Sequence, residues 1–127
     1  MPINILFVDD EPATVNLMKL LVELEQPAWT IHAAYDGETA LAIAARTPLD
    51  LVLVDISMPD MNGVEVCRRL RQMPNTAQLP VVMLTAQDTP QWREQSKAAG
   101  ATDFWVKPFK PATLVSAIAK LIENRQA

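Results

Sequence analysis

The most informative segment of the sequence is Leu51-Val52-Leu53-Val54-Asp55, in which four apolar residues in succession end at a carboxylate. A strand with one face in water alternates apolar and polar residues, whereas a strand covered on both faces can be apolar throughout. Residues 51–54 therefore predict a central strand of a parallel sheet that has helices on both sides, with Asp55 directly after it.

Apolar runs of the same kind occur on either side of this segment, at residues 3–8, 29–34, 81–84 and 104–106. The stretch after the first run has the spacing of one helix face, in Leu17, Leu20, Leu21 and Leu24. A strand followed by a helix, five times over, predicts a doubly wound α/β fold of five parallel strands and five helices. With no linker or repeat in between, we expect residues 1–127 to form a single domain.

Residues that favour helix ends stand where this pattern needs them. Asp36, Asn62 and Thr89 have side chains that can accept a hydrogen bond from the first turn of a following helix. Pro111 suits a first helical turn, and Gly100 suits a helix C-terminus, where positive φ is common. These signals predict helices that begin just after residues 36, 62 and 89.

The composition excludes several classes of protein. The 127 residues are 50% hydrophobic, which suits one domain with a sizeable core, and the net charge of -4 comes without a long basic run. Every apolar run is far shorter than the about 18 residues of a membrane span. Cys67 is the only cysteine, which favours a reducing compartment. We therefore expect a cytoplasmic protein that binds neither a membrane nor nucleic acid directly.

Polar residues follow the predicted strands where each strand ends. Asp9 and Asp10 follow the first strand and Asp55 the third, while Thr85 follows the fourth and Lys107 the fifth. Because the carboxyl ends of parallel strands meet at one edge of a sheet, these side chains should share one crevice. Two carboxylates about 4 Å apart repel by roughly 4 kcal/mol at an effective dielectric of about 20, and one lysine cannot neutralise three. A divalent cation resolves this repulsion, and oxygen ligands favour Mg²⁺.

Such a crevice suits phosphoryl transfer, in which a protein mainly positions groups and neutralises charge. Asp55 stands alone at the end of a central strand, whereas Asp9 and Asp10 form a pair suited to holding a metal ion. Asp55 is therefore the expected acceptor, which would form an acyl phosphate. Taken singly, each carboxylate also fits an ordinary turn or helix cap, so the prediction rests on their joint placement.

Several short segments resemble the receiver domain of two-component response regulators, and the resemblance covers essentially the whole chain. In chain order they are Asp9-Asp10, Asp55-Ile56-Ser57-Met58-Pro59-Asp60-Met61-Asn62-Gly63, Thr85-Ala86, Gly100-Ala101-Thr102-Asp103 and Lys107-Pro108-Phe109. The resemblance implies a flavodoxin-like fold with strand order 2-1-3-4-5, which sets the first and third strands side by side. It also implies a phospho-acceptor signalling domain rather than an enzyme.

The resemblance implies a role for each residue of the crevice. Asp55 would accept a phosphoryl group from the phosphohistidine of a sensor histidine kinase. Mg²⁺ would be bound by Asp10, Asp55 and the backbone carbonyl of Ser57, with Asp9 supporting the ion through water. Lys107 would pair with Asp55 or with its phosphate.

The resemblance also implies a conformational switch. The hydroxyl of Thr85 would move toward the phosphoryl group, and the aromatic residue at position 104, here Phe104, would turn inward. The peptide bond between Lys107 and Pro108 is expected to be cis, which proline makes accessible because it reduces the trans preference.

Partners are implied in the same way. The first helix, with Asn16 and Leu17 expected to be at least partly exposed, and the loop after Lys107 resemble the side that docks a sensor kinase or phosphotransfer protein. The face made by the fourth helix, fifth strand and fifth helix resembles a dimerisation or output surface. Arg93 and Lys97 could supply charges for contacts on that face.

Two alternatives stay open at the level of sequence. A phosphatase of the haloacid dehalogenase type also uses aspartate, lysine and Mg²⁺, but its motif needs a second aspartate two residues after the first, where this chain has Glu11. The other alternative is a receiver-like module that acts only through protein contacts, without phosphorylation. The sequence leaves the cognate kinase, the output and the oligomeric state open.

Overall fold

The computed structural model describes residues 3–126, in which five strands alternate with five helices. In chain order these are β1 (Ile3–Val8), α1 (Pro12–Glu25), β2 (Trp29–Ala34), α2 (Gly37–Arg46), β3 (Leu51–Asp55), α3 (Gly63–Arg71), β4 (Val81–Thr85), α4 (Pro90–Ala98), β5 (Asp103–Val106) and α5 (Pro111–Gln126). The predicted first two strands are confirmed without change, and each of the other three is one residue longer than predicted.

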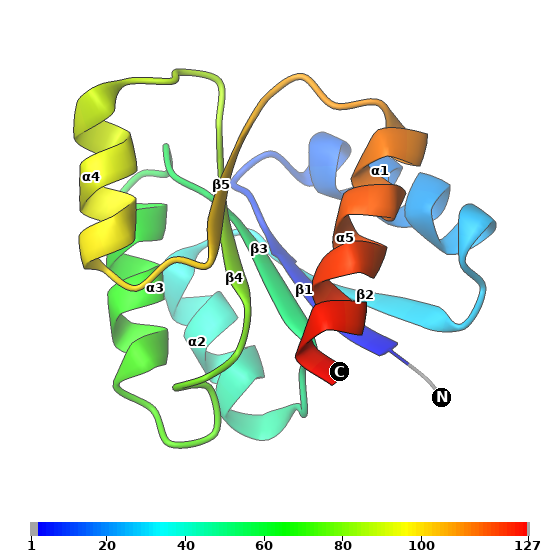
Figure 1. The fold of residues 1–127 in the computed structure, drawn as a ribbon, viewed down its shortest axis with the longest axis horizontal. Coiled ribbons are helices and arrows are strands. Elements are labelled where there is room, and N and C mark those ends of the chain that lie inside the picture. Colours follow the sequence, from blue (N-terminus) through cyan, green and yellow to red (C-terminus); the bar gives the residue numbers. More distant parts are fainter. Residues whose placement is uncertain (1–2, 127) are drawn as a thin grey trace.

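The strands form one parallel sheet in the order β2-β1-β3-β4-β5, as the resemblance implied. Figure 1 shows α1 and α5 on one face of this sheet and α2, α3 and α4 on the other. The chain turns from β1 toward one edge and from β3 toward the opposite edge, so the strand order reverses between these two neighbours. In such sheets a crevice forms at this reversal, beyond the carboxyl ends of the strands.

Each face of the sheet has its own apolar core. Successive side chains of a strand point to opposite faces. Leu53 accordingly packs with buried residues of α1 and α5, whereas Val54 packs with those of α2 and α3. Both side chains are at most 1% exposed. The double coverage explains why residues 51–54 are apolar without interruption.

The helices begin and end where the sequence signals predict. Asp36, Asn62 and Thr89 each accept a hydrogen bond from the backbone N–H three residues further on, at 2.7, 3.0 and 3.1 Å. α5 begins at Pro111. Gly100, two residues after the end of α4, has a φ of 95°. These local signals fix the boundaries of α2, α3 and α4, and hence the lengths of the loops around the crevice.

The leucines of α1 are not the residues that pack against the sheet. Val15 and Val22 are the buried residues of this helix. Leu17, Leu20 and Leu24, which we call the leucine stripe, are 57%, 57% and 68% exposed. The exposure of Leu17 agrees with the prediction, but of the four leucines at 0, 3, 4, 7 spacing three are exposed and only Leu21 is partly buried.

The helices are short relative to a membrane span. The longest among residues 3–126 is α5, with 16 residues. None of the described helices is both long and apolar enough to cross a membrane.

Candidate functional site

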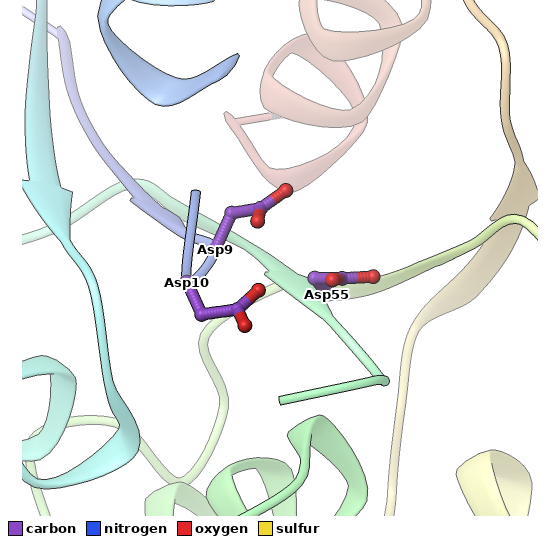
Figure 2. Close-up of side chains that lie close together, drawn as sticks. All are labelled: Asp9, Asp10 and Asp55. Carbon is purple, nitrogen blue, oxygen red and sulfur yellow. The ribbon is translucent and has the colours of Figure 1, made fainter. Parts of the chain in front are cut away.

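Three carboxylates meet where β1 and β3 end. In the parallel pairing of these strands Val8 lies opposite Val54, so Asp9 and Asp55, one residue further along, leave the sheet at the same level. Figure 2 shows the side chains of Asp9 and Asp10 extending toward Asp55. One carboxylate oxygen from each of the three residues lies within 4.8 Å of the others. Asp9 and Asp55 are buried and Asp10 is exposed, so the cluster opens to solvent on the Asp10 side.

Lys107 reaches both buried carboxylates from the end of β5. Its Nζ lies 3.2 Å from Oδ2 of Asp9 and 3.4 Å from Oδ1 of Asp55. Burial by itself lowers the pKa of this ammonium group, but the charges of Asp55 and Asp9 outweigh burial and raise its pKa above the ordinary value. Lys107 is therefore a permanent positive charge in the crevice, and one of its two partners, Asp9, is 98 positions away in the sequence.

Asp55 is an energetically unfavourable carboxylate. Its burial raises the pKa above the ordinary value of an aspartate, and the neighbouring charge of Asp9 raises it further. The positive charge of Lys107 offsets only part of this effect. An additional cation, or conversion of the carboxylate into a different group, would relieve the repulsion.

The loop after β3 stays close to the site because α3 begins at a glycine. The N–H of Gly63 donates to the carbonyl of Ile56 at 3.0 Å. A Cβ added to Gly63 would lie 2.4 Å from the backbone oxygen of Asp55, so no other residue allows this approach. Asp60, in the same loop, has a φ of 66°. Sequence reasoning assigned Gly63 no role of its own, although an Asn-Gly pair directly before a helix signals a tight turn.

The two residues expected to form a switch are both connected to the loop between β4 and α4. The hydroxyl of Thr85, which is 1% exposed, donates to the backbone carbonyl of Gln87 at 3.1 Å and accepts from its N–H at 3.0 Å. Phe104 is partly buried, and the guanidinium carbon of Arg93 lies 4.7 Å from the centroid of its ring. The Thr85 hydroxyl is thus bonded to the loop in this structure and not to a carboxylate.

The chemistry of the donor set fits Mg²⁺. The cluster offers carboxylate oxygens from Asp9, Asp10 and Asp55, with no histidine or cysteine in the same group. Hard oxygen ligands of this kind suit Mg²⁺, which is held by one or two carboxylates and keeps several waters.

The peptide bond between Lys107 and Pro108 is cis, as predicted. It lies directly after the residue that reaches the carboxylates, at the start of the loop from β5 to α5.

A parallel sheet of order 2-1-3-4-5 with an acidic cluster and a lysine at its carboxyl edge defines a phospho-acceptor signalling module rather than a catalytic enzyme. The family model described as response regulator receiver domain matches residues 5–119, and the chain belongs to this family. The match sets aside the alternative of a haloacid dehalogenase-type phosphatase.

Known proteins agree with this assignment. The chain is 36% identical over 123 residues to the transcriptional regulatory protein TrcR of Mycobacterium tuberculosis, covering 97% of this chain and 46% of TrcR. The chemotaxis protein CheY4 of Vibrio cholerae superimposes with a TM-score of 0.88 at 30% identity, covering 95% of this chain and 99% of CheY4. The chain thus spans less than half of TrcR but nearly all of CheY4.

One solved structure bears on the metal ion. The receiver domain of the sensor histidine kinase PA1611 from Pseudomonas aeruginosa is described with a magnesium ion coordinated in its active-site cleft. It superimposes with a TM-score of 0.85 at 28% identity and covers 97% of this chain and 99% of that domain.

Proposed function

We propose that Asp55 is the residue of this receiver domain that accepts the phosphoryl group. The observation that carries the proposal is its burial among Asp9, Asp10 and Lys107 at the reversal of strand order. Asp9 is the poorer acceptor because both of its oxygens are engaged, Oδ1 by the N–H of Glu11 at 3.0 Å and Oδ2 by Lys107. Asp55 contacts Lys107 through Oδ1, which leaves its second oxygen for attack on phosphorus.

The proposed step is a transfer between two covalent carriers. One oxygen of Asp55 forms a bond to phosphorus while the bond from phosphorus to the donor nitrogen of a phosphohistidine breaks. The electron pair of that bond stays on the imidazole, and Asp55 becomes an acyl phosphate. Lys107 remains paired with the site and neutralises part of the charge that the phosphoryl group brings.

We propose the metal ligands from the resemblance to receiver domains, and the acidic cluster supports this proposal. Asp10, Asp55 and the backbone carbonyl of Ser57 would hold Mg²⁺, and Asp9 would contact it through water. When bound, the ion would supply positive charge that offsets the charges of the carboxylates and of the phosphoryl group. Ser57 is exposed and stands two residues after Asp55 in the sequence.

Thr85 and Phe104 are the proposed switch residues. Once Asp55 is phosphorylated, the Thr85 hydroxyl would donate to a phosphoryl oxygen in place of the Gln87 carbonyl. A hydrogen bond to a charged oxygen is stronger than one to a neutral carbonyl, which supplies a driving force for the exchange. Phe104 would then turn inward.

A sensor histidine kinase or a phosphotransfer protein is the proposed donor, and α1 its docking element. The leucine stripe is an exposed apolar face on this helix. An apolar groove of about 220 Å³ lies beside it and next to the site, lined by Phe7, Thr14, Met18, Lys107, Pro108 and Phe109. The groove includes Lys107, so a partner that packed into it would lie next to the site.

Three further expectations stay proposals. Residues 1–127 would form one receiver domain, of which residues 1, 2 and 127 lie outside the described part of the chain. The face of α4, β5 and α5 would serve dimerisation or output. The protein would work in the cytoplasm, an expectation that rests on its single cysteine.

The acceptor assignment is tested by incubating the protein with Mg²⁺ and acetyl phosphate and measuring its intact mass. The expected result is a gain of one phosphoryl group, abolished in Asp55→Asn and by EDTA. Asp60→Asn, a change of the same type in the following loop, is the matched control and should be phosphorylated like the wild type. No mass gain in the wild type at saturating donor would favour the alternative of a module that acts without phosphorylation.

The docking assignment needs a separate measurement. Replacing Leu17 and Leu20 by glutamine should slow transfer from a phosphorylated kinase while leaving phosphorylation by acetyl phosphate unchanged. An equal loss with both donors would place the effect in the site and not in docking.

A further inference from the structure

Arg93 connects the loop after β4 to the aromatic side chain of β5. Its guanidinium donates two hydrogen bonds to Asp88, from Nε to Oδ1 at 2.5 Å and from Nη2 to Oδ2 at 3.0 Å. The guanidinium carbon lies 4.7 Å from the centroid of the Phe104 ring. Because a two-bond pair fixes the plane of a guanidinium, the position of Asp88 determines how Arg93 covers the ring.

The same loop is bonded to Thr85. The Thr85 hydroxyl holds both backbone groups of Gln87, the residue directly before Asp88. A continuous series of contacts therefore runs from Thr85 through this loop and Arg93 to Phe104. The hydroxyl cannot turn toward Asp55 and keep both bonds to Gln87, so its movement changes the restraint on Asp88.

The packing beside Phe104 leaves space for movement. A cavity of about 390 Å³ lies between α4 and β5, lined by Arg93, Phe104 and Ser96 among others. The Oγ atom of Ser96 is buried and has no hydrogen-bond partner among the described residues. Phe104 packs against the core cluster on this face of the sheet, and the guanidinium of Arg93 lies over its ring beside the cavity.

We propose that Arg93 is a latch on Phe104. While the pair with Asp88 is intact, the guanidinium holds the ring in its partly buried position. When the Thr85 hydroxyl leaves Gln87, the loop that carries Asp88 loosens and Arg93 releases the ring. The inference rests on the proposed switch roles of Thr85 and Phe104 and adds the residue that couples them.

The contact of Arg93 with Phe104 shifts the equilibrium between the two positions of the ring but does not prevent the ring from moving. The side chains of Arg93 and Asp88 are 53% and 44% exposed, so water screens their attraction. An exposed contact between a cation and an aromatic ring changes an equilibrium constant by about fivefold, and phosphorylation easily overcomes such a bias.

Fluorine NMR tests the latch directly, because the chain has only three phenylalanines. The full chain is labelled with 4-fluorophenylalanine, and the Phe104 signal is assigned with Phe104→Leu. Addition of Mg²⁺ and beryllium fluoride, which mimics the phosphoryl group, defines the signal of the switched state. Arg93→Ala without beryllium fluoride should shift the Phe104 signal toward that position, as expected for an about fivefold change in the equilibrium.

Three variants separate the latch from a general effect of surface charge. Asp88→Asn should shift the signal in the same direction, and combining it with Arg93→Ala should add little, since the two residues act as a unit. Lys97→Ala removes a cation one turn further along α4 that contacts no aromatic ring among residues 3–126, and it should leave the signal in place. Gln87→Ala keeps the backbone bonds to Thr85 and should also be silent.

The outcomes are distinguishable from those of the acceptor assignment. A Phe104 signal that stays in place in a folded Arg93→Ala variant, or that moves equally in Lys97→Ala, overturns the latch. A signal that moves away from the switched position also overturns it. If beryllium fluoride moves no signal in the wild type and acetyl phosphate adds no mass, the proposed function fails, whereas the effect of Arg93→Ala on the ring is still measured.

Discussion

Lys107 donates a hydrogen bond of 3.2 Å to Asp9 across 98 positions of the sequence. The bond joins the end of β5 to the end of β1, although β3 and β4 lie between these strands in the sheet. Lys107 also pairs with Asp55, so one ammonium group serves two buried carboxylates. Removal of the Lys107 charge would therefore leave both Asp9 and Asp55 without this counter-ion.

We expect Lys107→Ala to destabilise the protein in the absence of Mg²⁺, because Asp9 and Asp55 would lose their shared counter-ion. The free energy of unfolding should fall by about 1–3 kcal/mol, less than for a fully buried pair since the Lys107 side chain is 26% exposed. Urea denaturation measures the change, and Mg²⁺ should stabilise the variant more than the wild type. Lys110→Ala, an exposed lysine in the same loop, is the control. Equal stability of Lys107→Ala and wild type would contradict the prediction.

Asp55→Asn should stabilise the protein without metal at neutral pH. Burial raises the pKa of Asp55 in the folded chain above the usual 3.8, so the folded state holds this proton more tightly than the unfolded state. By linkage, the contribution of Asp55 to stability falls as the pH rises from about 3.8, the ordinary pKa, through the raised pKa of the folded state. The advantage of Asp55→Asn should therefore grow over this interval and then level off.

Thermal unfolding at several pH values measures this difference. A gain of about 1 kcal/mol corresponds to a rise of about 2–8 °C in Tm for domains of this size. Asp60→Asn, in the exposed part of the next loop, should show no such trend. A gap between Asp55→Asn and wild type that stays constant with pH would show that the charge of Asp55 is not its cause.

Gly63→Ala should impair both stability and phosphorylation. The added Cβ would lie 2.4 Å from the backbone oxygen of Asp55, which cannot move without displacing the acceptor. We expect a loss of about 1–3 kcal/mol in the free energy of unfolding. Gly37→Ala is the matched control, because its Cβ would meet the flexible end of Met61 instead. Comparable phosphorylation rates for the two variants would argue against the close approach.

Leu20→Gln should change the free energy of unfolding by less than about 0.5 kcal/mol, because the side chain is 57% exposed. Val22→Ala, two residues along the same helix, removes buried methyl groups and should cost about 1–3 kcal/mol. Urea denaturation of both variants measures these changes in the free energy of unfolding. A large loss for Leu20→Gln would mean that the leucine stripe is covered by the protein itself.

The strands could be predicted from sequence because burial on both faces leaves a direct mark on composition. Residues 51–54 are apolar throughout, and each lies in one of the two cores. The face of α1 could not be predicted in this way. Leu17 and Val22 lie on different faces of one apolar helix, and only the position of the sheet decides which of them is buried.

The contacts that charged and polar side chains make within the chain could not be predicted from the sequence either. The sequence indicates only that Arg93 could supply a charge on the face of α4, β5 and α5, whereas the structure shows its guanidinium bonded to Asp88 and lying over Phe104. Thr85 was placed at the crevice, but the direction of its hydroxyl, toward Gln87, follows from the course of the next loop. The direction of a side chain depends on neighbours that are distant in the sequence or that lie in an adjoining loop.

The sequence determined the five strands, the five helices and the residues at the strand ends, because these depend on local apolar patterns, helix caps and turns. The tertiary structure decided that Asp9, Asp10 and Asp55 share a space of a few ångströms, and that Lys107 neutralises two of them. It also left the leucine stripe exposed and placed Arg93 over Phe104. Distances between charges depend on strand order and register, which arise only when the whole sheet packs between its two layers of helices.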